Sequence, residues 1–159
     1  MSGASGDVLR RLEKTPRFPL LCGPTPLHRM EQLEQALGCG PLYIKRDDLT
    51  PLGLGGNKAR KLEFLVADAL ARGANTLVTV GGVQTNHGRL TAAAAAKAGL
   101  ACTLVLEGSR PEVPSGNLLL DCLLGASLVY TDGQPVQDIV DHALKRLTDA
   151  GKKPYFIPE

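Results

Sequence analysis

The chain has 159 residues, 43% of them hydrophobic and 21% charged, and its formal net charge is +2. It is therefore long enough to bury a core, and its 18 basic and 16 acidic residues predict neither a nucleic acid nor a membrane surface as a partner. An aromatic content of 4% without tryptophan also argues against a stacking platform for single-stranded nucleic acid.

The four cysteines show no C-x-x-C spacing. Cys102 and Cys122 lie in apolar stretches, where we expect them to behave as small hydrophobic residues. This usage predicts a reduced, cytoplasmic setting. The first residues lack the apolar core of a signal peptide, and no apolar stretch approaches the length of a membrane span.

The first part of the chain, to about residue 57, is predicted to be irregular. Four prolines between residues 16 and 26 favour an extended segment that crosses the rest of the molecule. Within this part, residues 30–37 form a candidate short helix that ends at Gly38, and residues 42–45 read as a strand.

From Lys58 onward the sequence alternates between helical and strand patterns. Apolar residues at intervals of three and four predict an amphipathic helix that begins at Lys58 and ends at Gly73. The next elements are strands at 76–80, 102–107 and 127–130, helices at 86–98 and 116–124, a helix with an apolar face over 136–147, and a strand from 154. This alternation predicts an α/β fold, a parallel sheet flanked by helices.

The stretch LGLGGNKARKLEFL (52–65) places three glycines just before Lys58 at a helix start. The glycines would let a flat ligand approach the backbone, and the positive end of the helix dipole would favour the neutral amine that Schiff-base chemistry needs. The alternative is a surface lysine after a flexible loop. A P-loop is excluded by the spacing and by the missing Ser/Thr after the lysine, and the G-x-G-x-x-G dinucleotide fingerprint is absent.

In the stretch TVGGVQTNHGRL, a strand leads through Gln84, Thr85, Asn86 and His87 into a helix. Thr85 or Asn86 can serve as the N-cap, which is a sufficient structural reason for either residue. Polar side chains at a helix N-terminus also suit a ligand site, and spacing alone does not decide between the two. His87 alone would be structural or solvated, but beside a reactive lysine it becomes a candidate acid–base group.

Adjacent carboxylates follow the strand at 42–45, in KRDDLTP. Because Lys45 and Arg46 precede Asp47 and Asp48 directly, we expect a local charge network. We predict no metal site, since no set of His, Cys and Asp shows ligand spacing.

Together these stretches resemble a known family from about Pro24 to Glu159. TPLHRMEQL, YIKRDDLTPLGLGGNKARKLEFL, GGVQTNHGRLTAAAAAKAGL and GNLLLDCLLGA resemble, in this order, the D-cysteine desulfhydrase and 1-aminocyclopropane-1-carboxylate deaminase family of fold-type-II, tryptophan-synthase-β-like enzymes. The resemblance implies pyridoxal 5'-phosphate as cofactor, with Lys58 as its Schiff-base lysine. It also implies that Asn57 flanks this lysine and that Asn86 hydrogen-bonds the ring hydroxyl of the cofactor.

The resemblance further implies roles toward a small amino-acid substrate. Thr85 stands where the family usually has a serine that binds substrate or moves a proton, and its additional methyl group bears on the substrate range. Gln84 would lie beside the substrate carboxylate. His87 is typical of the desulfhydrase-like members, whereas the deaminase-like members carry glutamine there. This favours β-elimination from D-cysteine to pyruvate, sulfide and ammonia, with 1-aminocyclopropane-1-carboxylate deamination as the alternative.

The family's phosphate loop and catalytic tyrosines belong to a chain roughly twice this length. The resemblance therefore implies that residues 1–57 are an N-terminal segment of the large domain, that 58–159 are a small Rossmann-like domain, and that the chain is a fragment. As partners we expect a homodimer for the intact parent and association with the missing C-terminal half. A non-enzyme alternative is a standalone binding module in which Lys58 is a relic.

Overall fold

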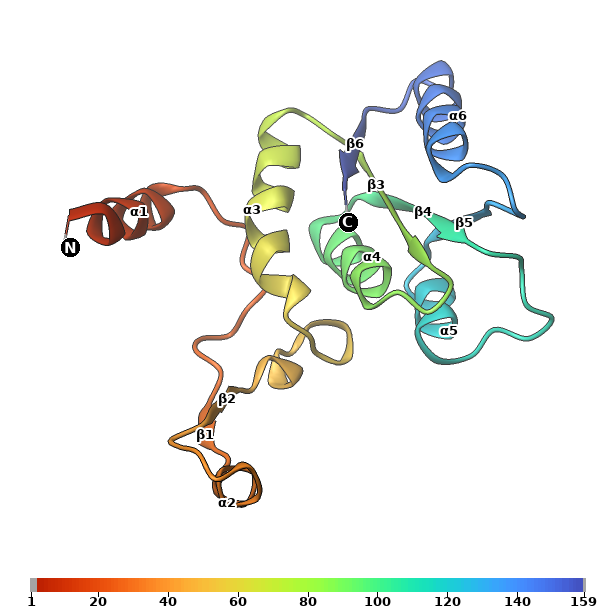
Figure 1. Cartoon of the computed structure of the whole chain (residues 1–159). Helices are drawn as coiled ribbons and strands as arrows, with labels where there is room; N and C mark the ends of the chain where they lie inside the picture. Colours follow the sequence, from red (N-terminus) through yellow and green to blue (C-terminus); the bar gives the residue numbers. More distant parts are fainter. Residues whose placement is uncertain (1–2, 159) are drawn as a thin grey trace.

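A four-stranded parallel sheet forms the centre of the computed structural model, which describes residues 3–158 (Figure 1). Its strands follow the order β5-β4-β3-β6. Their bounds are Thr76–Gly82 for β3, Ala101–Glu107 for β4, Ser127–Tyr130 for β5 and Pro154–Ile157 for β6. The α/β fold with a parallel sheet is thereby confirmed.

Helices cover both faces of this sheet. The helices are α3 (Lys58–Ala71), α4 (Asn86–Ala98), α5 (Gly116–Leu123) and α6 (Val136–Asp149). Side chains of α3, α4 and α5 share the larger core cluster with Leu104 and Leu106 of β4, whereas α6 packs on Val105. Because successive strand residues point to opposite faces, α6 lies on the face opposite to the other three helices.

The N-terminal part contains a helix that the sequence analysis did not predict. Residues Gly3–Lys14 form α1, so the expectation of irregular structure is wrong there. The helix lies before the first proline of the chain, and an Asp7–Arg11 ion pair of 2.9 Å joins successive turns. In both figures α1 stands apart from the sheet.

Along the chain, the residues that follow α1 form a small separate unit before the sheet begins. Strands β1 (Leu27–Arg29) and β2 (Tyr43–Lys45) pair antiparallel, and α2 (Glu31–Leu37) connects them. Short 3-10 turns follow at Asp47–Leu49 and Leu52–Leu54. The predicted short helix and the strand after it are confirmed, but β1 was missed.

The extended segment that precedes β1 is fastened along α3. The Oε1 atom of Glu63, a residue only 6% exposed, accepts hydrogen bonds from the backbone N–H groups of Leu20 and Leu21 at 3.1 and 3.0 Å. The Phe18 N–H donates to the Glu63 carbonyl at 2.8 Å, and the Leu20 side chain is fully buried. The predicted crossing segment is therefore confirmed.

Asp47 forms a second attachment to α3. Its carboxylate accepts hydrogen bonds from Arg60 Nε at 2.7 Å, from Arg60 Nη2 at 2.5 Å and from the Thr25 hydroxyl at 2.8 Å. The Arg60 hydrogen bond, opposed by burial and aided by Thr25, lowers the pKa of Asp47 to about 2. The expected charge network holds for Arg46 and Asp48, whereas the main partner of Asp47 lies in α3.

Three expectations on composition can be compared with the structure. Cys102 is buried, which raises the pKa of its thiol to about 12, but Cys122 is exposed, so the prediction for that residue is wrong. Among residues 3–158, no group of three or more His, Cys, Asp or Glu side chains could hold a metal ion. Within the same range, no helix has the length and hydropathy needed to cross a bilayer.

We predict that Asp47→Asn lowers the free energy of unfolding by about 1–3 kcal/mol, because it removes a charged acceptor from Arg60 and Thr25. Urea denaturation measures this loss. The control is Asp48→Asn, whose more exposed pair with Arg46 should contribute less. Equal losses in the two variants would contradict an anchoring role for Asp47.

Candidate active site

The glycine loop, residues 52–57, packs tightly against α4. A Cβ atom added at Gly53 would lie 2.9 Å from Cβ of Ala93, and one added at Gly56 would lie 2.9 Å from Cδ1 of Leu90. Both glycines also have positive φ angles, 52° and 139°. The expected unusual backbone angles are therefore found, and the contact with α4 is a second reason for these glycines; the approach of a flat ligand stays a prediction.

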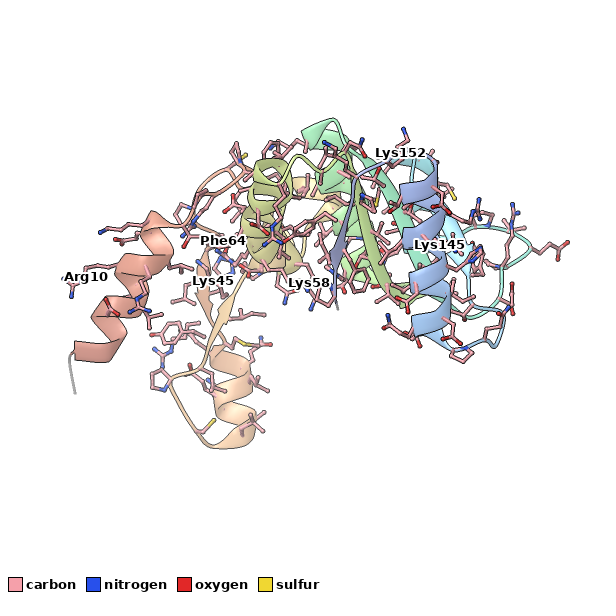
Figure 2. All side chains as sticks on the ribbon, turned by 90° about the horizontal axis from the view of Figure 1, so that it is seen from above. Arg10, Lys45, Lys58, Phe64, Lys145 and Lys152 are labelled. Carbon is pink, nitrogen blue, oxygen red and sulfur yellow. The ribbon has the colours of Figure 1, made fainter. Side chains whose placement is uncertain are left out.

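Lys58 follows this loop as the first residue of α3. Its side chain is half-buried, and within residues 3–158 no hydrogen bond or ion pair of its amine is found. Asn57 precedes it at the N-cap without a side-chain capping bond. Figure 2 shows Lys58 between the N-terminal part and the sheet. The amine therefore lies near the start of a helix and forms no hydrogen bond or ion pair with a described residue.

The first turn of α4 lies next to this region. Thr85 is the N-cap, and its hydroxyl accepts a hydrogen bond from the Gly88 N–H at 3.3 Å, which confirms the capping role. Asn86 follows as the first helical residue, and its side chain is exposed. The Thr85 hydroxyl proton and the Asn86 amide are therefore both available to a ligand.

The methyl group of Thr85 is accommodated by two glycines. A Cβ at Gly88 would lie 2.5 Å from Cγ2 of Thr85, and a Cβ at Gly81 would lie 2.7–3.0 Å from the Oγ1, Cβ and Cγ2 atoms of Thr85. Real Cβ atoms do not approach this closely. The methyl group thus occupies space that Gly88 leaves open on the helix itself.

Gln84 connects β3 to the start of α5. Its side-chain N–H donates to the Ser115 carbonyl at 3.0 Å, and its side-chain oxygen accepts from the Asn117 N–H at 2.9 Å. The Asn117 side chain in turn donates to the Gln84 carbonyl at 2.8 Å. These bonds give Gln84 a structural role at the α5 N-terminus, and substrate contact by this residue stays a prediction.

His87 points into the protein, where it is fully buried. Its Nε2 lies 3.0 Å from Oγ1 of Thr79, and the Thr79 hydroxyl donates to the Ile157 carbonyl at 2.7 Å. Because that hydroxyl has a single proton, His87 must donate from Nε2–H, which leaves Nδ1 unprotonated. No described residue hydrogen-bonds Nδ1. Burial, reinforced by the charges of Lys61 and Lys58, lowers the pKa of His87 to about 4.

The start of α3, with Asn57 and Lys58, lies near the start of α4, since the charge of Lys58 acts on His87. Thr85 and Asn86 belong to that start of α4, while the side chains of Gln84 and His87 are engaged by protein groups. The Lys58 amine can act as a nucleophile or base, and Thr85 and Asn86 can donate hydrogen bonds. Sequence reasoning missed Arg89, which is buried and donates to Gly55. The sequence feature that could have identified Arg89 is its position as a charged residue directly before the alanine-rich, apolar part of α4.

Comparisons with known proteins relate the chain to a family of enzymes. The model of the family described as "Pyridoxal-phosphate dependent enzyme" matches residues 19–159. The D-cysteine desulfhydrase of Yersinia enterocolitica is 48% identical over 155 residues, covering 93% of this chain and 46% of that protein. The 1-aminocyclopropane-1-carboxylate deaminase of Rhizobium leguminosarum bv. viciae is 45% identical over 157 residues, covering 92% of this chain and 46% of that protein.

A solved structure has the same fold. The crystal structure of a protein described as an ACC deaminase homologue superposes with a TM-score of 0.86 at 41% identity, covering 95% of this chain and 46% of that chain. The chain thus spans about half the length of the curated relatives it matches.

We predict that His87 makes stability fall as the pH drops from about 6.5 to about 4. The pKa of His87 is lower in the folded state, so in this window the unfolded state binds a proton that the folded state does not. His87→Gln should therefore lower the slope of the free energy of unfolding against pH in this window by up to about 1.4 kcal/mol per pH unit.

Denaturation at several pH values, with the exposed His142→Gln as control, measures this difference. Asp121, with a pKa raised to about 6, contributes the opposite slope but is present in every variant. Equal slopes in the wild type and His87→Gln would contradict the buried neutral state.

We predict strong coupling between Thr85 and Gly88. Gly88→Ala should destabilise the wild type, because the new Cβ meets the Thr85 methyl group, but it should be neutral or stabilising by up to about 1 kcal/mol in a Thr85→Ser background, where alanine is the better helix former. A double-mutant cycle on unfolding free energies should give a coupling of at least about 1 kcal/mol. Gly82→Ala, whose Cβ meets nothing within 4 Å, should be additive with Thr85→Ser. Additivity at Gly88 would refute the contact.

Proposed function

Because this chain belongs to the family of pyridoxal-phosphate dependent enzymes, we propose that it supplies the lysine and the substrate-side polar groups of a β-eliminating enzyme acting on D-cysteine. The single observation that carries this proposal is the placement of Lys58. Its amine, without a partner among residues 3–158, lies at the start of α3, behind a glycine loop that packs on α4, whose first turn presents Thr85 and Asn86.

The residues present fit the aldehyde and hydroxyl side of a pyridoxal ring. Within the described residues, neither the Lys58 amine nor the Asn86 amide has a hydrogen-bond partner. The charge of Lys58 also acts on His87, the residue after Asn86, which indicates that the two helix starts are close. Lys58 would hold the cofactor through its aldehyde, and Asn86 would hydrogen-bond the ring hydroxyl.

The bound cofactor supplies an electron sink for the pair of electrons left when the α-proton of the substrate is removed. Lys58 Nζ, as the free amine, is the base that accepts this proton. The Thr85 hydroxyl accepts the Gly88 N–H, so its own proton is free to donate to the substrate. One D-cysteine and one water molecule together contain the atoms of one pyruvate, one hydrogen sulfide and one ammonia.

The substrate assignment has one close alternative, deamination of 1-aminocyclopropane-1-carboxylate. The relatives named above carry both activities in their names at 48% and 45% identity. D-Cysteine is favoured by His87, which is typical of desulfhydrase-like sequences. Because His87 is buried on Thr79, we propose that it influences the reaction by holding the first turn of α4 and not by touching the substrate.

We propose that the N-terminal part, residues 1–57, packs against further polypeptide of the same protein, and that the complete protein is a homodimer. Apolar side chains of the β1–β2 unit and the loop after it are exposed in the structure, among them Leu27 at 61%, Tyr43 at 55% and Leu54 at 78%. Several exposed large apolar side chains in one part of a chain are typical of an interaction surface.

We predict that pyridoxal phosphate, followed by borohydride reduction and peptide mapping, labels Lys58 in preference to other lysines, because this residue is half-buried and its amine has no competing partner among the residues described. Lys58→Ala should abolish this label and the accompanying visible absorbance band. The exposed Lys97→Ala is the control and should retain both. A main label on another lysine would contradict the proposal.

In the complete protein with cofactor bound, D-cysteine should yield sulfide and pyruvate in equal amounts, and both should disappear in Lys58→Ala. Production of 2-oxobutanoate and ammonia from 1-aminocyclopropane-1-carboxylate, without sulfide from D-cysteine, would support the alternative substrate. Binding of an amino acid without turnover would support a non-catalytic binding module.

A further inference from the structure

A buried arginine that the proposed reaction does not use lies against the glycine loop. Arg89 is only 7% exposed, and its Nη2 donates to the Gly55 carbonyl at 2.9 Å. Its Nη1 and Nη2 atoms also lie 3.8 Å from where a Cβ would stand at Gly53 and Gly56. The guanidinium therefore contacts all three glycines of the loop that precedes Lys58.

The negative charge that acts on Arg89 belongs to Asp121 in α5. Asp121 is fully buried, and its negative charge opposes the lowering of the Arg89 pKa that desolvation causes. No described residue hydrogen-bonds either carboxylate oxygen of Asp121, or the Nε and Nη1 atoms of Arg89. Burial of such incompletely paired charges is unfavourable for stability. A buried apolar side chain would fill this place at a lower cost, so stability alone does not explain the arginine.

The other bonds of the loop do not fix it to α4. The Gly56 N–H donates to the Asp47 carbonyl and to the Thr50 hydroxyl, both at 2.9 Å, and these groups belong to the N-terminal part. Among the described residues, Arg89 makes the hydrogen bond between the loop and α4. Arg89 is three residues after Asn86, so the two side chains lie on the same side of α4. Arg89 makes the contact with the loop, and Asn86 makes the proposed contact with the cofactor.

We propose that Arg89 is a positioning residue for Lys58: its bond to Gly55 fixes the glycine loop, and with it the start of α3, relative to Thr85 and Asn86. This inference rests on the proposed function of Lys58. Glycines restrain a backbone weakly, so a loop built on three of them needs an external restraint to hold the residue that follows. A planar guanidinium with fixed donor directions provides that restraint better than a flexible ammonium group does.

The test uses Arg89→Met, Arg89→Lys and the exposed control Arg110→Met in the full chain. Two quantities are measured at a temperature where the circular dichroism is native. One is amide hydrogen exchange of peptides covering 52–58, without cofactor. The other is the ratio of pyridoxyl label on Lys58 to label on Lys97 after borohydride reduction.

In Arg89→Met we expect exchange over 52–58 to accelerate about tenfold, with β3 and β4 unchanged, and the labelling ratio to fall by about tenfold. Arg89→Lys should give intermediate values, and Arg110→Met should match the wild type. If Arg89→Met does not fold, Arg89→Lys decides alone.

Wild-type exchange and labelling in a folded Arg89 variant would overturn the positioning role, and so would acceleration spread evenly over β3 and β4. A wild-type protein without preference for Lys58 would instead overturn the proposed function. The exchange of residues 52–58 would then still decide whether Arg89 holds the loop.

Discussion

The close contact between the glycine loop and the first turns of α4 determines the arrangement of the whole candidate site. It brings the backbone before Lys58 within van der Waals distance of Leu90 and Ala93, which only residues without a side chain permit. Since Thr85 and Asn86 begin the same helix, their positions relative to Lys58 depend on this contact. The sheet contributes by presenting α4 at the carboxyl end of β3, where ligands of open α/β sheets bind.

Several residues here serve structure and chemistry together. Thr85 caps α4 with its hydroxyl oxygen yet retains a hydroxyl proton to donate, so the two interpretations of the sequence are compatible. Gln84 and His87 are different, because their side chains already have protein partners, at the start of α5 for Gln84 and in β3 for His87. Both side chains therefore help to hold the first turn of α4, whatever contact Gln84 makes with a substrate.

The sequence predicted the elements after Lys58 well, since hydrophobic periodicity and terminal glycines are local signals. The helix at 86–98 even has its predicted bounds. What could not be predicted depends on residues far apart in the chain: Asp47 pairs with Arg60, Gln84 binds residues 115 and 117, and Thr79 joins His87 to Ile157. Helix α1 was missed because the irregular structure that the four following prolines predict was extended to the residues before them.

The order of strands in the sheet has a consequence for how the chain folds. Strand β3 pairs with β4, which follows it closely, but its other neighbour is β6, with Thr76 opposite Pro154. Closing so long a loop is slow, because its entropy cost precedes any gain from the contact. During synthesis, β3 is made long before β6 and has an unpaired edge until then, which is the kind of edge that promotes aggregation. The late arrival of β6 thus leaves this edge of β3 open while the segment between the two strands is being made.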